Sequence, residues 1–186
     1  MSSARILAVV NTVCAFFIVA CSAGDVGAPR SPLAASPSST ADNVGAGANQ
    51  QLAAARQATA KYHDFQQALA DGYVQASGCV EGEGFHYRRP NEFPNASLNC
   101  VFDPANPEVL HYAPKQNGEL QLVGVEYLVP RRASCGTLAS PPEGFSGGAD
   151  EWELEVGGTI WALNAWIWQG VPDGVFAFRS EKITCN

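Results

Sequence analysis

The chain has 186 residues, and its 18 acidic side chains outnumber its 11 basic ones, for a formal net charge of −7. Such an excess of negative charge is unsuited to the phosphate backbone of nucleic acids, so we expect no nucleic-acid partner. The length fits one folded domain with attached segments.

An apolar run from Ile6 to Ala20 follows Arg5 near the N-terminus. The run is shorter than the roughly 20 residues of a membrane-spanning helix and has the size of a signal-peptide core. It ends in the letters IVAC, which resemble the lipobox of bacterial lipoproteins. The resemblance predicts a signal peptide over residues 1–20 and a lipid such as palmitate on Cys21. The alternative is an ordinary signal peptide that is cleaved after Ala23.

Residues 21–49 consist largely of Ser, Ala, Pro and Gly, with almost no large apolar side chain. Such a segment cannot bury enough surface to offset its chain entropy, so it is predicted to be a disordered tether. Together, the signal, lipid and tether predict an exported protein that is anchored to the cell membrane or outer membrane. The folded part would then face the periplasm or the exterior.

Residues 50–186 contain all four tryptophans and all five tyrosines, and they are predicted to form a single α+β domain. Residues 49–74 are rich in Ala, Gln and Leu, with apolar residues at spacings of three, four and seven, which predicts one long amphipathic helix. Residues 78–107 are rich in Gly and Pro, which predicts a long irregular loop.

A β-hairpin is predicted over residues 108–130, because two β-rich runs flank Asn117 and Gly118. A two-residue turn at this pair, or a four-residue turn over 115–118, pairs odd positions with even ones. One face of the hairpin is then expected to carry His111, Leu122, Gly124 and Glu126. The other is expected to carry Tyr112, Val123, Val125 and Tyr127.

Two further strands are predicted from alternating patterns, which gives an antiparallel sheet of four to six strands under the helix. In residues 150–158, Glu151, Glu153 and Glu155 are expected on a solvated face. In residues 159–170, one face is expected to carry Asn164 together with Trp166 and Trp168.

Four cysteines fall in the predicted domain, namely Cys79, Cys100, Cys135 and Cys185. None forms a C-x-x-C pair, which disfavours zinc-ribbon and thioredoxin-like sites, whereas an even number in an exported domain favours two disulfides. Three connectivities are possible. We favour Cys79–Cys185 with Cys100–Cys135, because the first bond would hold the C-terminus in place and restrict the unfolded chain by about 4–5 kcal/mol.

Three polar residues lie where apolar ones are expected. Glu126 and Asn164 interrupt apolar strands, and His86 lies among aromatic residues in a glycine-rich segment. Buried polar groups of this kind need partners, so each is either an internally satisfied group or part of a site.

The segments "GEGFHYRRPN", "NPEVLHYAP…NGELQLVGVEYLVP" and "ALNAWIWQGVPDGVFAFRSEKITC" resemble the successive blocks of an uncharacterised family of exported bacterial proteins. The resemblance covers residues 60–185 and carries no activity with it. It implies that His86 and Glu126 match the family's histidine and glutamate, and that Asn164 replaces a second histidine. Two histidines and a carboxylate form a known metal triad, but Asn is a weak ligand. His111, which shares a face with Glu126, is the alternative nitrogen ligand.

The leading hypothesis is a lipoprotein domain that binds a small ligand or a divalent metal at His86, Glu126 and Asn164. Its pocket walls are predicted to be Phe85, Tyr87, Trp166 and Trp168. One alternative is a structural or protein-interaction module of the cell envelope without a ligand site. The other is a metal-assisted hydrolase or oxygenase. We favour a protein that is not an enzyme, and no catalytic residue is assigned.

Overall fold

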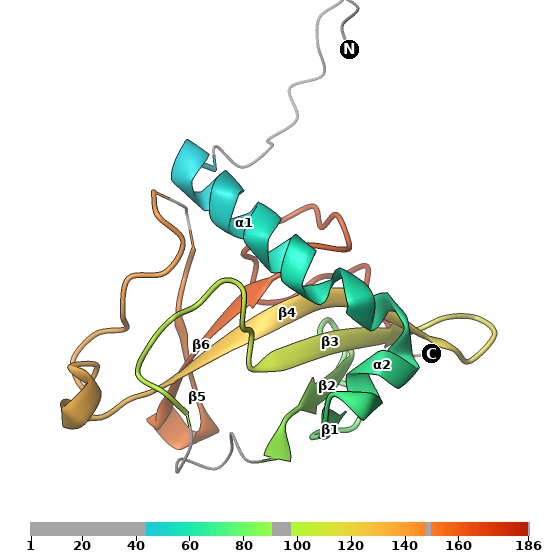
Figure 1. Ribbon diagram of the computed structural model, residues 1–186, viewed down its shortest axis with the longest axis horizontal. Coiled ribbons are helices and arrows are strands. Elements are labelled where there is room, and N and C mark those ends of the chain that lie inside the picture. The colour runs from blue at the N-terminus through green and yellow to red at the C-terminus, as the bar shows by residue number, and fades with distance from the viewer. Residues whose placement is uncertain (1–43, 91–97, 148–149, 186) are drawn as a thin grey trace, which may run out of the picture. The chain divides into compact units, whose positions relative to one another are not determined.

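The computed structural model describes residues 44–90, 98–147 and 150–185 (Figure 1). These residues all belong to one compact unit of the chain. The predicted signal peptide, Cys21 and most of the tether lie outside the described residues. Within the described ranges, no helix combines the length and the apolar character that crossing a bilayer requires.

In the described part of the chain, six strands form one antiparallel sheet with the order β1-β2-β3-β4-β6-β5. They are β1 (Val74–Gln75), β2 (Phe85–Arg88), β3 (Val109–Pro114), β4 (Leu120–Pro130), β5 (Glu153–Glu155) and β6 (Ile160–Ala165). The predicted α+β class and antiparallel sheet are confirmed. The irregular loop predicted over residues 78–107 is wrong in part, because it contains β2, the strand that carries His86.

Helices cover one face of this sheet (Figure 1). They are α1 (Ala46–Thr59), the 3₁₀ turn η1 (Ala60–His63) and α2 (Phe65–Ala70). The single long helix predicted over residues 49–74 is not formed, because the backbone at Asp64 is extended and its side chain caps α2 by accepting from Gln66 N. The break lets two short pieces follow the twisted sheet, where Leu52 and Tyr62 join the same core as Tyr112.

The β3–β4 hairpin turns through three residues, 116–118, since Lys115 N bonds to Glu119 O and Gly118 N bonds to Lys115 O. With this turn, odd-numbered residues of β3 pair with odd-numbered residues of β4, whereas both predicted turns pair odd-numbered with even-numbered residues. A β-bulge between His111 and Tyr112 then restores the predicted parity, so that His111 pairs with Gly124. The predicted face of His111, Gly124 and Glu126 is therefore confirmed.

Two residues next to the bulge lie on the faces opposite to those predicted. Leu122 pairs with Tyr112 and joins the core under the helices, whereas Val123 packs with Trp166 and Ile183 on the other face. An extra residue in one strand of an antiparallel pair is the physical cause, because it reverses the alternation from that point.

Both favoured disulfides are present, Cys79–Cys185 and Cys100–Cys135. The first joins the segment before β2 to the end of the described chain. The second joins the segment before β3 to the 3₁₀ turn η3 (Ala133–Cys135), which follows β4.

Candidate metal centre

The face of the sheet opposite the helices carries a cluster of polar side chains from four adjacent strands. His86 of β2 pairs with His111 of β3, and Glu126 of β4 pairs with Asn164 of β6. Their neighbours along the strands, such as Tyr112 and Tyr127, alternate to the helix face and fill its core. Strand alternation therefore brings all four predicted ligand candidates to one face.

These side chains are close enough to share a ligand. One ligand atom each from His86, His111 and Glu126 lies within 4.8 Å of the other two. His111 lies at the centre, with its Nε2 atom 3.7 Å from Glu126 Oε2 and 3.1 Å from Asn164 Oδ1. The imidazole rings of His86 and His111 are 4.5 Å apart between centroids. His111, the alternative nitrogen ligand, is thus more central than Asn164.

Hydrogen bonds orient the His111 ring. Its Nδ1 atom lies 3.1 Å from the carbonyl oxygen of Glu83 and so carries the proton that this acceptor requires. In the neutral ring, Nε2 then holds a lone pair, directed towards Asn164 Oδ1. The Asn164 amide is itself fixed, because its Nδ2 donates to Phe178 O at 2.9 Å. Two acceptor atoms therefore face each other, an arrangement that a cation between them would stabilise.

His86 has a similar pair of neighbours. Its Nδ1 atom is 2.8 Å from Ser77 Oγ, and that hydroxyl donates to Gly78 O. Since the hydroxyl proton is used, Nδ1 is the donor in this pair, and Nε2, which faces a carboxylate oxygen of Glu83, would have to give up its proton to bind a metal. Nε2 lies 3.1 Å from Glu83 Oε2, whose other oxygen accepts from Arg179 Nε at 2.8 Å. Histidines that bind a metal commonly donate their second ring N–H in this way.

The buried charges of the cluster are perturbed. Burial, followed by the negative charges of Glu155, Glu83 and Glu108, raises the pKa of Glu126 well above its usual range. Burial, followed by the charge of His86, lowers the pKa of His111 well below its usual range. Both shifts have the sign expected for groups that lack a compensating charge, which a bound cation would supply to the carboxylate.

A pocket of about 280 Å³ opens beside the cluster. Glu126 and His86 form part of its lining, together with Ser77, Glu83 and Glu155. Val109, Leu128 and Val156 give it an apolar wall. A metal bound by the cluster would therefore have one side towards a cavity large enough for water or a small ligand.

The predicted pocket walls are mostly on the other side of the sheet. Phe85 and Tyr87 pack under the helices, where the ring of Phe65 lies 5.0 Å from that of Tyr87. Trp168 also lies there and donates to Thr59 Oγ1 at 3.2 Å. Strand alternation explains the first two, since they flank His86. Trp168 follows the end of β6, where the alternation no longer holds.

Trp166 alone of the four contacts the cluster, with its ring centroid 5.0 Å from that of His111. Gly124 makes room for this contact: a Cβ there would lie 2.7 Å from Trp166 Cε3. The glycine in the letters LVGVE thus lets the indole cover the His111 side of the cluster, and Trp166 Nε1 donates to Ala177 O.

Sequence reasoning missed Glu83, Ser77 and Glu155. Glu83 lies three residues before His86 in a tight turn closed by Val80 and Gly84, a spacing that brings its carboxylate back to the histidine. Glu155 was expected on a solvated face, yet it is half-buried beside the pocket. Its position follows from the pairing of β5 with β6, which the alternating pattern alone does not specify.

Two imidazole nitrogens and one carboxylate, with an open side, form a donor set that suits zinc or iron(II). Bound in such a set, a metal can polarise a ligand oxygen or acidify a bound water. A scan against models of protein families and searches of curated proteins and of solved structures found no match for this chain.

Proposed function

We propose that this domain binds one divalent transition-metal ion through His86 Nε2, His111 Nε2 and a carboxylate oxygen of Glu126. The observation that carries the proposal is that one ligand atom each of His86, His111 and Glu126 lies within 4.8 Å of the other two, while the second nitrogen of each imidazole is held by a carbonyl or hydroxyl oxygen. Two imidazoles held in this way beside a buried carboxylate are an arrangement that suits a divalent cation.

The distances require a small contraction on binding. Ligand bonds of about 2.1 Å place two donors on one ion at most about 4.2 Å apart. The 3.7 Å between His111 Nε2 and Glu126 Oε2 already meets this limit, and the largest separation in the cluster is below 4.8 Å. His86 is the ligand that moves, because it is partly exposed whereas His111 is fully buried.

Asn164 supports the site as a positioning residue. Its carbonyl oxygen is 3.1 Å from His111 Nε2, and its amide is tied to Phe178 O. Amide oxygens bind hard cations better than zinc, so Asn164 directs its carbonyl dipole at an ion beside His111 Nε2 and becomes a direct ligand only of a harder ion.

The pocket supports a small ligand on the open side of the metal. Its apolar wall and its carboxylates suit a compact molecule with an apolar part and a metal-binding oxygen or a basic group. Metal-assisted hydrolysis or oxygenation is the chemistry that such an arrangement would permit, and we propose binding rather than turnover as the function of this chain.

A structural role for the polar cluster is the second candidate. Asn164 links His111 to the segment at Phe178, and Arg179 in that segment contacts Glu83. These contacts hold the C-terminal segment against the sheet without any metal. If this is their whole function, then no added ion will change the stability of the protein.

We also propose that the protein is exported and anchored by a lipid on Cys21. The lipobox-like letters support the lipid, and the two disulfides are compatible with an oxidising compartment. Incorporation of labelled palmitate into the wild type, but not into Cys21→Ala, would support the anchor. Equal labelling of both, or none of either, would contradict it.

Thermal unfolding with and without Zn²⁺, after treatment with a chelator, tests the metal proposal. An ion at about 100 times its dissociation constant stabilises the folded state by about 2.7 kcal/mol. The melting temperature of the wild type should rise on addition of Zn²⁺. His63→Gln, a control at an exposed histidine outside the cluster, should show the same rise. His86→Gln should lose most of it. A wild type that does not respond to Zn²⁺, Fe²⁺ or Mn²⁺ would contradict metal binding and favour the structural role.

A further inference from the structure

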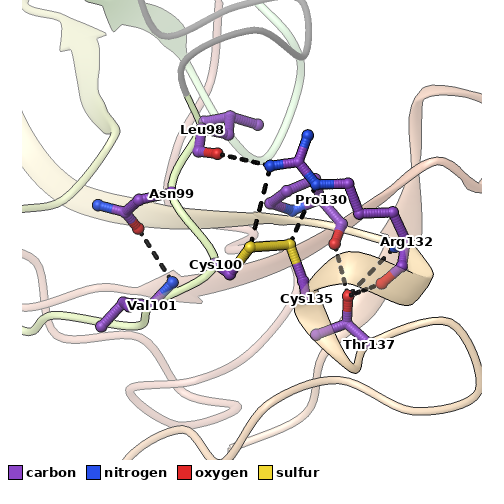
Figure 2. Close-up of a disulfide and its surroundings, with 8 residues drawn as sticks. All are labelled: Leu98, Asn99, Cys100, Val101, Pro130, Arg132, Cys135 and Thr137. Atoms are coloured by element: carbon purple, nitrogen blue, oxygen red, sulfur yellow. Dashed lines mark hydrogen bonds between the residues drawn. A yellow bond between two sulfur atoms is a disulfide. The ribbon is translucent and has the colours of Figure 1, made fainter.

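The two disulfides have charged neighbours of different sign. Arg132 lies beside Cys100–Cys135, with its Nε atom donating to Cys135 Sγ at 3.1 Å and its Nη2 atom 3.9 Å from Cys100 Sγ (Figure 2). By contrast, the charged neighbour of Cys79–Cys185 is a carboxylate that contacts the backbone, since Glu81 Oε2 accepts from Cys185 N at 3.2 Å. A cation next to sulfur stabilises a thiolate, and an anion destabilises one.

Arg132 is held in this position by the local fold. Its backbone N–H donates to Thr137 Oγ1, and its carbonyl accepts from Cys135 N on the 3₁₀ turn η3. Its Nη2 atom also donates to Leu98 O at 3.3 Å, on the segment that carries Cys100 (Figure 2). The bond to Leu98 O therefore holds the guanidinium next to the sulfur atoms.

The bond is also within reach of solvent. Both Cys100 and Cys135 are partly exposed, and Val101, Ala133 and Ser134 beside them are exposed. The loop that this disulfide closes spans 35 residues, against 106 for the other. On the chain-entropy model the shorter loop restricts the unfolded chain less, so its bond is the weaker constraint of the two.

We propose that Cys100–Cys135 is a thiol-exchange site, with Cys100 as the sulfur that is attacked and Cys135 as the leaving group. Its co-reactant is a dithiol reductant. The attacking thiolate forms a bond to Cys100 Sγ, the Cys100–Cys135 bond breaks, and the electron pair leaves on Cys135 Sγ beside Arg132. The lower the pKa of a leaving thiol, the faster such a step proceeds.

The second thiol of the reductant then closes on the mixed disulfide. It attacks the reductant's own sulfur and releases Cys100, so that the dithiol is oxidised by two electrons to a cyclic disulfide. The two protons of the dithiol go to the two released cysteine sulfurs or to solvent. This site is separate from the metal cluster and does not depend on it.

Graded mixtures of reduced and oxidised dithiothreitol test the proposal on the full oxidised chain. Free thiols are trapped by alkylation, and mass spectrometry of peptides gives the opened fraction of each disulfide. We expect Cys100–Cys135 to open at least about tenfold faster than Cys79–Cys185 and at a lower proportion of reductant. Simultaneous opening of both bonds would overturn the proposal.

The variant Arg132→Gln should slow the opening of Cys100–Cys135 by about fivefold or more. Arg131→Gln, at the neighbouring arginine, should leave the rate unchanged. A merely structural role for Arg132 predicts the opposite sign, because a loosened fold opens both disulfides faster. Unchanged or faster opening in Arg132→Gln would therefore overturn the proposal.

A single-thiol probe such as glutathione identifies the attacked sulfur. We expect the trapped adduct on Cys100, with Cys135 found as the free thiol. An adduct predominantly on Cys135 would overturn the assignment of the leaving group.

Discussion

Gly84 is predicted to be required both for the fold of β2 and for the position of His86. Its φ angle is +81°, and a Cβ at this position would overlap the carbonyl oxygen of Tyr112 on the neighbouring strand. Gly118, in the β3–β4 turn, has nearly the same φ angle, +82°, but open space around it. Alanine substitution at each glycine therefore separates the energetic cost of the backbone conformation, which both share, from the cost of the steric clash, which only Gly84 has.

The substitution Gly118→Ala should cost about 1–2 kcal/mol from the left-handed backbone, partly offset by about 0.4–1 kcal/mol of lost freedom in the unfolded chain. Gly84→Ala carries the same two contributions and adds about 1–3 kcal/mol, because Tyr112 and the adjacent strand must shift. The free energy of unfolding in urea, followed by tryptophan fluorescence, should differ between the variants by this added amount.

Metal binding provides a second measurement on the same pair. A shift of β2 at Gly84 displaces both Glu83 and His86, so Gly84→Ala should bind Zn²⁺ more weakly, whereas Gly118→Ala should bind as the wild type does. If the two variants differ by less than about 0.5 kcal/mol in stability, the close approach of Gly84 to Tyr112 has no energetic consequence and the reasoning is refuted.

Three further outcomes follow from the structure. In metal-free protein, Glu126→Gln should become more stable relative to the wild type as the pH rises above about 4.5, because burial raises the folded pKa of Glu126 and its ionisation destabilises the fold; a pH-independent difference in unfolding free energy would contradict this. Replacing Cys79 and Cys185 by Ala should lower the free energy of unfolding by about 4–5 kcal/mol on the chain-entropy model, and a loss below about 1 kcal/mol would be inconsistent with that role. Val156→Asn should raise the melting temperature, because Val156 is exposed with a φ angle of +49° that Asn tolerates better, and a lower melting temperature would count against backbone strain there.

Strand alternation made part of the site predictable. The common face of His111, Gly124 and Glu126 follows from a period of two, and so does that of Asn164. The predicted length of the β3–β4 turn was wrong, yet the bulge after His111 restored the predicted pairing beyond it. Near the turn the same error put Leu122 and Val123 on the wrong faces, because a bulge has no reliable signature in an alternating pattern.

The pocket was less predictable than the ligands. Glycines and prolines around residues 78–94 hid the strand β2, so Phe85 and Tyr87 were grouped with His86, although alternation puts them on the helix face. The acidic residues at the pocket depend on contacts between distant segments, such as Arg179 with Glu83. The helix break at Asp64 was hidden by the strong helix propensity on both sides of it.

X-ray absorption at the zinc edge of the full chain loaded with one equivalent of Zn²⁺ tests the central claim most directly. The metal proposal predicts two imidazole ligands with further oxygen ligands, one imidazole fewer in His86→Gln and in His111→Gln, and an unchanged spectrum in His63→Gln. A spectrum without imidazole scattering in the wild type, or one that neither cluster variant alters, would contradict a metal centre at His86, His111 and Glu126.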